Sequence, residues 1–265
     1  MNRNAGSSQS RPIALYLTGE HECSYLPDRS ARTLFVDPLA RINAPTYQSL
    51  LEQGFRRSGS HIYRPACRRC RACISLRIPV HAFAADRSQR RNLRTNAAEV
   101  RVQDRRPAFD PEHFDLYRRY LVARHPDGAM AEGTADNYRD FLIDPWGGET
   151  RLLEFRLNGH LMAVAVTDVT PGGLSAVYTF FDPALSARSP GTFAILCQIE
   201  AARALGLPYL YLGYWIEECR KMNYKTRFRP VEAWNGRCWD TLRPGQAISD
   251  PASPSPCGHG PGSKA

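Results

Sequence analysis

Residues 150–216 decide the fold, and they read TRLLEFRLNGHLMAVAVTDVTPGGLSAVYTFFDPALSARSPGTFAILCQIEAARALGLPYLYLGYWI. The first part of this segment holds three apolar runs, which are separated by Asn158-Gly159 and by Pro171-Gly172-Gly173. Asn-Gly is a strong hairpin signal, and Pro-Gly-Gly supplies a second turn. We therefore expect three consecutive strands joined by short connections.

A helix is expected after these strands, ending near Gly206, which suits a C-terminal cap. Its apolar stripe at helical spacing consists of Phe193, Leu196, Ile199 and Ala202. The run PYLYLGYWI at 208–216 then reads as a buried strand. Three strands, a helix and a further strand are typical of an α/β protein with a mixed sheet.

Outward from this segment, the chain divides into four expected parts. Residues 1–12 are expected to be a disordered leader, and the Pro/Gly/Ser-rich residues 244–265 a disordered tail. Residues 13–106 are expected to form a small α+β region that carries the arginine and cysteine clusters. Residues 107–243 are expected to form a second domain, which opens with two amphipathic helices and continues into the strands above.

Shorter elements complete the prediction. We expect strands at 14–17, 33–36, 60–64 and 73–80, and a closing strand pair within 228–242. One helix is expected over 45–55, with Pro45 near its start. Another is expected over 88–100, with Ser88 as its N-cap.

The composition indicates an ordinary folded protein, with 43% hydrophobic and 10% aromatic residues among 265. We find no run of about 18 apolar residues, which a membrane-spanning helix would need. The first residues show no signal-peptide core or cleavage site. We therefore expect a cytoplasmic protein without a membrane partner.

Positive charge is concentrated in residues 56–106. This block holds fourteen arginines and three acids, a net charge of +11, whereas the whole chain carries +9. The planar guanidinium group matches phosphate geometry, so the block predicts a nucleic-acid contact. The candidates are Arg56, Arg57, Arg64, Arg68, Arg69, Arg90 and Arg91. The alternative is a solvated basic face.

Three cysteines stand three apart in the segment CRRCRAC, namely Cys67, Cys70 and Cys73. Cysteines at this spacing can converge on one ion, and a closed site needs a fourth ligand. Cys23 is the best candidate, with His21 and His61 as alternatives. Such ligands would accept zinc or an iron–sulfur cluster, and the arginine-rich surroundings should lower the pKa of the thiols. The alternative is a set of semi-buried thiols in a tight turn.

The helix that begins near residue 190 presents another candidate site. Helix N-termini offer unpaired N–H groups and a positive dipole end, so they bind phosphate. Arg188, Gly191 and Thr192 lie at this terminus and could seat a cofactor pyrophosphate or the 3′ end of an RNA. An ordinary capped loop is the alternative.

Residues 209–227 combine aromatic and basic side chains. Tyr211 and Tyr214 lie on the expected strand, and Lys221, Lys225 and Arg227 follow. A cationic, aromatic pocket of this kind could hold a carboxylate while its rings stack bases or pack an apolar side chain. Alternatively, the rings belong to the core and the lysines cap a helix end.

Six stretches together resemble the aminoacyl-tRNA–protein transferase family, specifically its bacterial branch, which transfers leucine. They are CSYLPDRSARTLFVDP, GFRRSGSHIYRPACRRCRACISLRIPV, RSQRRNLRTN, YTFFDP, GTFAILCQIEAARALGLPYLYLGYWI and KMNYKTRFRPVE. The resemblance implies transfer of leucine from leucyl-tRNA to the α-amine of proteins that begin with Asp or Glu, which marks them for proteolysis. It also implies a GNAT-like acyltransferase domain after a cysteine- and arginine-rich region.

The chain departs from the eukaryotic branch of this family at the cysteines. That branch has C-G-Y-C where this chain has Cys23-Ser24-Tyr25-Leu26, and adjacent cysteines where it has Ala72-Cys73. The cluster-binding theme of that branch therefore transfers only to Cys23 and Cys73.

The resemblance implies site roles. The aminoacyl ester is already activated, so the chemistry requires no cofactor. The catalytic candidates are Asp182, Tyr178 and Tyr214. The base could be Asp182 or a tyrosine acting through water, and the oxyanion could be stabilised by N–H groups or by Tyr178. The acidic side chain of the acceptor is expected to meet Lys221, Lys225, Arg227 or Arg94, with Phe180 and Tyr211 also at the substrate.

Other functions remain open at this point. The donor could be arginyl-tRNA, as in the eukaryotic branch. An acyl-CoA-dependent N-acyltransferase is a further alternative, although LSARSPGTF lacks the second glycine of the usual pyrophosphate loop. A non-enzymatic zinc-ribbon RNA-binding module is the third, and the long second half of the chain argues against it.

Overall fold

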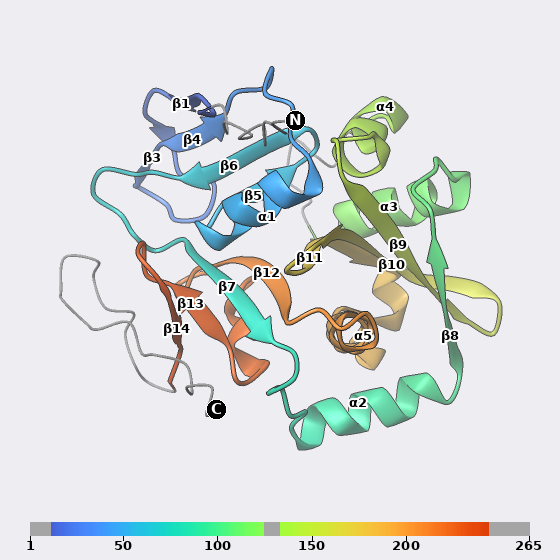
Figure 1. Ribbon diagram of the computed structural model, residues 1–265. Coiled ribbons are helices and arrows are strands. Elements are labelled where there is room, and N and C mark those ends of the chain that lie inside the picture. Colours follow the sequence, from blue (N-terminus) through green and yellow to red (C-terminus); the bar gives the residue numbers. More distant parts are fainter. Residues whose placement is uncertain (1–11, 125–132, 244–265) are drawn as a thin grey trace, which may run out of the picture.

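The computed structural model describes residues 12–124 and 133–243 of the chain. The expected disordered tail and, apart from residue 12, the expected leader lie outside these residues. The described part is a mixed α/β structure around one large sheet and one small sheet (Figure 1).

The large sheet has eight strands in the order β14-β13-β7-β12-β11-β10-β9-β8. Their bounds are β14 Trp239–Thr241, β13 Glu232–Trp234, β7 Ile74–Pro79, β12 Tyr209–Trp215, β11 Gly173–Phe181, β10 His160–Thr170, β9 Glu149–Leu157 and β8 Val100–Arg105. Only β11 and β12 pair in parallel, so the sheet is mixed. This confirms the coarse fold class and the three consecutive strands expected over 150–181.

The two regions expected on either side of residue 106 share this sheet. β7 lies between β12 and β13, and β8 forms the far edge beside β9. Both strands come from the amino-terminal part of the chain, whereas their neighbours come from the carboxy-terminal part. The boundary at residue 106 therefore does not separate two sheets.

The small sheet has the order β1-β4-β6-β5, with bounds β1 Leu15–Leu17, β4 Thr33–Val36, β6 His61–Pro65 and β5 Arg56–Ser58. Two further strands of two residues each, β2 (His21–Glu22) and β3 (Ser30–Ala31), pair with each other in a separate antiparallel ladder. The sequence predicted β1, β4 and β6 but missed β5, because its three residues, RRS, are polar and without alternation.

Helices cover both faces of the large sheet. They are α1 Ala44–Glu52, α2 Arg87–Ala97, α3 Pro111–Arg124, α4 Ala135–Tyr138 with the π-helical turn η2 Arg139–Ile143, and α5 Pro190–Ala204. On β10, Ala163 and Ala165 pack with α5. Val164 and Val166 face the opposite way and pack with α3. The alternation of β10 thus places α5 and α3 on opposite faces.

Two details of the helices differ from expectation. α2 begins after Asp86, whose carboxylate accepts from Gln89 N in a capping box, and not at Ser88. It also ends at Ala97, and the residues from Val100 form β8. The sequence predicts the run AAEV as the last turn of the helix, because alanine and glutamate are good helix formers, and this prediction is wrong.

Candidate functional site

The parallel pair β11–β12 opens partway along its length. Pairing covers only Gly173–Ser175 against Tyr209–Tyr211. β11 then continues to Phe181 and β12 to Trp215 without pairing to each other, and we call this opening the β11–β12 split. Main-chain groups that face the split need partners from elsewhere in the fold.

Arg56, from β5 of the small sheet, supplies one such partner. Its Nη2 donates to the Ala176 carbonyl at 2.9 Å, and the residue is only 5% exposed. On the β12 side, a Cβ placed on Gly213 would lie 3.3 Å from Arg56 Nη2, so the glycine lets the guanidinium approach β12. Nη1 is buried and has no partner among the described residues.

Arg57, the next residue of β5, points to the opposite face and is fully paired. It donates from Nε and Nη2 to Asp168, with both distances 2.7 Å, and both side chains are buried. Thr150 Oγ1 donates to the same carboxylate at 2.7 Å. The sequence predicts Arg57 as a tRNA contact. Asp168 occupies its Nε and Nη2 donors, so we do not propose that Arg57 binds a phosphate.

Tyr214 and Lys225 border Arg56 on the β12 side. The Tyr214 hydroxyl points at two carbonyl oxygens, Gly54 O at 2.9 Å and Tyr63 O at 3.1 Å, and burial raises its pKa well above the ordinary value. Tyr214 therefore positions the strand and stays protonated. Lys225, in the short helix η4 (Asn223–Arg227), donates from Nζ to the Tyr214 carbonyl at 2.6 Å.

Lys225 has an unusual acidity for a lysine. Burial is the main cause, and the positive charge of Arg56 is the second, and together they lower the pKa of Lys225 to about 7. The side chain is half-buried, and no carboxylate pairs with it in the described part of the chain. A lysine in this state gains a proton readily when an anion arrives.

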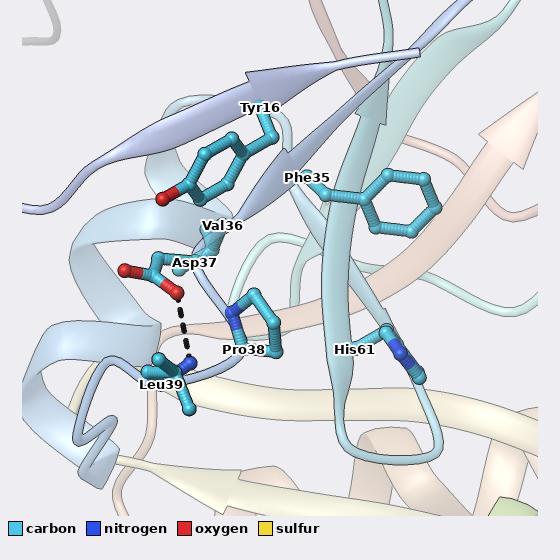
Figure 2. A pocket seen from close by; sticks show the side chains of 7 residues that line it. All are labelled: Tyr16, Phe35, Val36, Asp37, Pro38, Leu39 and His61. Carbon is cyan, nitrogen blue, oxygen red and sulfur yellow. Dashed lines mark hydrogen bonds between the residues drawn. The ribbon is translucent and has the colours of Figure 1, made fainter.

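A row of aromatic rings leads from the surface to this place. The Phe35 and Tyr63 ring centroids are 6.0 Å apart, and those of Tyr63 and Tyr214 are 5.9 Å apart. Phe35 and His61 also line the mainly apolar groove of Figure 2, together with Tyr16, Val36, Asp37, Pro38 and Leu39. The row therefore connects this groove, on the small sheet, with the β11–β12 split.

The carboxylate of Asp182, expected to be a base, is engaged at the end of β11. Oδ1 accepts from Ala184 N at 2.9 Å, which caps the 3-10 helix η3 (Pro183–Arg188). Oδ2 accepts from Arg119 Nη1 at 3.0 Å. Both oxygens thus have structural partners.

Tyr178 and Phe180 lie on the face of β11 that packs toward α3. Phe180 is fully buried, which places it in the core and out of reach of a substrate. Tyr178 packs against Phe141 and Tyr117, and burial raises its pKa. Its phenol therefore stays protonated and can only donate.

The N-terminus of α5 lies beside α2. Arg188, just before it, pairs with Glu99 at 2.5 Å, and its carbonyl accepts from Asn92 at 2.9 Å and from Asn96 at 3.1 Å. Gly191 and Thr192 form the partly exposed first turn of α5. The α2–α5 junction is thus a fixed, polar corner of the molecule.

α2 also presents a basic ridge. The ridge consists of Arg87, Arg90, Arg91 and Arg94, all of them exposed. Their spacing of i, i+3, i+4 and i+7 sets them on one side of the helix. The ridge is the densest group of exposed arginines on one element, and it adds Arg87 to the residues singled out from the sequence.

The other expected tRNA contacts are scattered. Arg64 donates to Gln53 O at 3.0 Å and lies over the Phe55 ring. Arg68 lies 3.8 Å from Glu20, and Arg69 is exposed. These arginines belong to the β6–β7 side of the molecule, and α2 belongs to another (Figure 1).

The remaining substrate candidates differ in exposure. Lys221 and Arg227 are exposed on either side of Lys225, and the Arg227 carbonyl accepts from Gln89 at 3.1 Å. Tyr211 is fully buried, and its hydroxyl accepts from Gln48 at 3.0 Å. Of the expected acceptor-binding cations, only Lys225 lies beside the β11–β12 split.

The four expected cysteines, Cys23, Cys67, Cys70 and Cys73, lie near one another, and Cys219 lies near them as a fifth. Burial raises the pKa of Cys73 to about 12, and the neighbouring thiols of Cys67, Cys23, Cys70 and Cys219 add to the shift. The expectation that arginines would lower the thiol pKa is therefore wrong for Cys73, because burial dominates. Cys219 was missed, since it stands alone in the sequence and the fold brings it here.

The thiol chemistry suits zinc or an iron–sulfur cluster. Within residues 12–124 and 133–243, no group of three or more His, Cys, Asp or Glu side chains is placed to hold a metal ion. Cys70 instead accepts from Arg29 at 3.6 Å. A metal at these cysteines therefore stays a prediction.

Comparison with known proteins identifies the family. Residues 21–91 match the model for the amino terminus of arginine-tRNA-protein transferase, and residues 112–235 match the model for its carboxy terminus. The chain is also 51% identical, over 232 residues, to the aspartate/glutamate leucyltransferase of Pseudomonas paraeruginosa, covering 87% of this chain and 97% of that protein. The chain belongs to the arginine-tRNA-protein transferase family.

Members of this family from other bacteria are about as similar. The aspartate/glutamate leucyltransferase of Hahella chejuensis is 50% identical over 235 residues, covering 89% of this chain and all of that protein. Solved structures are more distant. L-PGS from Bacillus licheniformis gives a TM-score of 0.44 at 11% identity, covering 55% of this chain and 46% of that one. FemX gives a TM-score of 0.43 at 10% identity, covering 66% of this chain and 61% of that one.

No helix in the described residues is both long enough and apolar enough to cross a membrane.

Proposed function

We propose that the protein transfers leucine from leucyl-tRNA to the α-amine of proteins whose first residue is Asp or Glu. The observation that carries this proposal is the 51% identity to a leucyltransferase over 97% of that protein's length. A new amino-terminal leucine would then mark the acceptor for proteolysis. Both substrates would meet in the cytoplasm, where aminoacyl-tRNA is made.

The reaction needs few catalytic groups. The α-amine attacks the ester carbonyl, a C–N bond forms, and the ribose oxygen of the tRNA leaves and takes up a proton. A free α-amine has a pKa of about 8, so roughly a tenth of it is neutral at pH 7. Holding two reactants in place can supply about 7–11 kcal/mol. Positioning is therefore the main task that we assign to the protein.

Among the three catalytic candidates, Tyr178 keeps a direct role in this proposal. Within the described residues its hydroxyl makes no hydrogen bond, and its raised pKa keeps the hydrogen available for an oxyanion. Tyr214 acts by positioning, because its hydroxyl is engaged with two carbonyls. Asp182 orders the end of β11 through its cap and its pair with Arg119.

The tRNA would lie across the α2 ridge. Four exposed arginines at helical spacing offer phosphate contacts, and the N-terminus of α5 beside them could receive the 3′ end. The α2–α5 contact, fixed by Asn92 and Asn96, keeps these two parts together. Arg68 and Arg69 remain candidates for a second contact with the tRNA.

We propose that the second region is a GNAT-like acyltransferase domain. The support is its strand order, with α5 connecting the parallel strands β11 and β12, and the splitting of that pair. A metal in the cysteine cluster stays a prediction, and the mechanism above uses none.

A direct test is transfer of a labelled amino acid. The purified protein would be incubated with leucyl-tRNA or with arginyl-tRNA, plus a peptide that begins with Asp or Glu. We expect leucine on the peptide's amino terminus and no arginine. Arginine in its place would move the protein to the other donor class, which the name of the family model favours. No transfer from either tRNA would refute the proposed function.

A further inference from the structure

We propose that Arg56, together with Lys225, binds the acidic side chain of the acceptor's first residue. The inference rests on the proposed transferase function and assigns one subsite within it. The sequence predicts Arg56 as a tRNA contact and predicts four other cations, Lys225 among them, as contacts of the acceptor.

The first argument is a buried positive charge without a counter-ion. Arg56 is 5% exposed, and no ion pair within the described residues includes it. Its neighbour Arg57 is just as buried but has Asp168 on both arms of its fork. Burying a cation unpaired costs several kcal/mol, and a bound anion offsets that cost. The same strand thus holds one arginine, Arg57, whose charge is paired with a carboxylate, and one, Arg56, whose charge has no carboxylate partner among the described residues.

The second argument is the direction of the free donors. Arg56 Nη2 is held by the Ala176 carbonyl, which leaves the buried Nη1 without an acceptor. Lys225 Nζ is held by the Tyr214 carbonyl, one residue from Gly213, which approaches Arg56. A carboxylate placed between them would accept from Nη1 with one oxygen and from Nζ with the other. Both contacts would be charge-assisted hydrogen bonds.

The third argument is selectivity between acids and their amides. Asn and Gln have the shape of Asp and Glu but carry no charge and only one acceptor oxygen. In this place an amide would leave a buried cation uncompensated, so the site would reject it. The flexible stem of Lys225 can adjust to the one-methylene difference between Asp and Glu.

A nucleic-acid phosphate is the other anion to consider. The exposed ridge on α2 already offers several guanidinium groups to phosphates that lie on the surface. Arg56, in contrast, offers one unpartnered and buried NH2 group, Nη1, in the β11–β12 split, beyond the half-buried Tyr63. A single buried donor beside a lysine suits one small carboxylate better than a backbone phosphate. The test below separates the two ligands.

The test compares Arg56→Gln, Arg56→Lys and Lys225→Gln with the wild type and with the control Arg139→Gln. Arg139 is a partly exposed arginine that pairs with Asp136 on α4. Each variant would be assayed for kcat/KM on peptides that begin with Asp, Glu, Asn or Gln. Peptide binding and tRNA binding would be measured separately by fluorescence anisotropy.

For Arg56→Gln we expect kcat/KM on the Asp and Glu peptides to fall about 30- to 1000-fold, the usual range for truncating a buried charge contact. Preference for Asp over Asn should fall by a similar factor, mainly through KM. Arg56→Lys should recover part of both, and tRNA affinity should stay within about twofold. The control should match the wild type.

Three results would overturn the inference. They are an unchanged preference for Asp over Asn, an equal loss on the acidic and amide peptides, and a loss confined to tRNA binding. If Arg56→Gln does not fold, as judged by thermal unfolding, the partly exposed Lys225→Gln decides by the same ratio. If the wild type transfers nothing, the proposed function fails, and the peptide-binding measurements still show whether this site binds acids.

Discussion

The buried ion pair Arg57–Asp168 should contribute strongly to the free energy of unfolding, because it joins the small sheet to the large one. Asp168 lies on β10 and accepts two hydrogen bonds from Arg57, each of 2.7 Å, and a third from Thr150, also of 2.7 Å. The guanidinium lies over the Trp146 ring at 5.1 Å, and Trp146 donates to Thr150 at 2.9 Å. The four residues form one connected network of hydrogen bonds and a cation–π contact.

Replacing the acid, Asp168→Asn, leaves the Arg57 cation buried with its charge uncompensated. Breaking such a pair from one side costs about 3–5 kcal/mol of unfolding free energy. For a chain of this size, 1 kcal/mol corresponds to about 2–4 °C, so Tm should fall by roughly 6–20 °C. Urea denaturation followed by tryptophan fluorescence would measure the free energy, and calorimetry the Tm.

The matched control is Asp136→Asn, which removes an exposed acid from its pair with Arg139 and should cost less than about 1 kcal/mol. The double variant Arg57→Met with Asp168→Leu should recover much of the stability, because it removes both buried charges. A loss below about 1 kcal/mol for Asp168→Asn would refute the reasoning, since it would mean that water reaches Arg57.

Three further predictions concern binding and the split. Arg90→Gln with Arg91→Gln should weaken tRNA affinity without changing transfer selectivity, and should reduce the slope of log K against log salt by about 1.5, measured by filter binding. A salt slope equal to the wild type's would remove the α2 ridge from the tRNA contact. Binding of an Asp-initiated peptide should weaken as pH rises through about 7, because bound carboxylate favours the charged form of Lys225, whose pKa in the free protein is lowered to that value. A titration series from pH 6 to 8.5 should show this slope in the wild type and a smaller one in Lys225→Gln, and identical slopes would contradict it. Gly213→Ala should cost more stability than Gly159→Ala, by about 1 kcal/mol or more: both glycines have positive φ, but only at Gly213 would a Cβ meet a neighbour, the guanidinium in the split. Equal costs in thermal unfolding would mean that the guanidinium moves away freely.

Local chemistry explains what was predictable from the sequence. The turn at Asn158-Gly159 forms with φ values of 50° and 87°, which only residues tolerant of the left-handed region adopt at low cost. α5 begins at Pro190 and is followed by Gly206 at φ 67°. These signals lie within a few residues of the structure they produce. The core of the large sheet was predictable for that reason.

The site was less predictable, because its partners come from distant parts of the chain. Arg57 finds its acid 111 residues away, and Arg56 finds a carbonyl 120 residues away. Charge counting placed both on a surface, since a run of arginines usually is one. Cys219 joins the cysteines of residues 23–73 only because β12 pairs with β7. Periodicity in the sequence does not predict contacts between residues so far apart in the chain.

One signal in the sequence does separate the two arginines, and it follows from strand geometry. Adjacent residues of a strand point to opposite faces, so Arg56 and Arg57 cannot share a role once β5 is a strand. Arg56 pairs across the ladder with Tyr63, whose ring approaches Tyr214, whereas Arg57 pairs with the buried Ile62. One face of β5 therefore closes the core with a complete ion pair. The other carries its unpaired charge into the β11–β12 split, where a substrate can complete it.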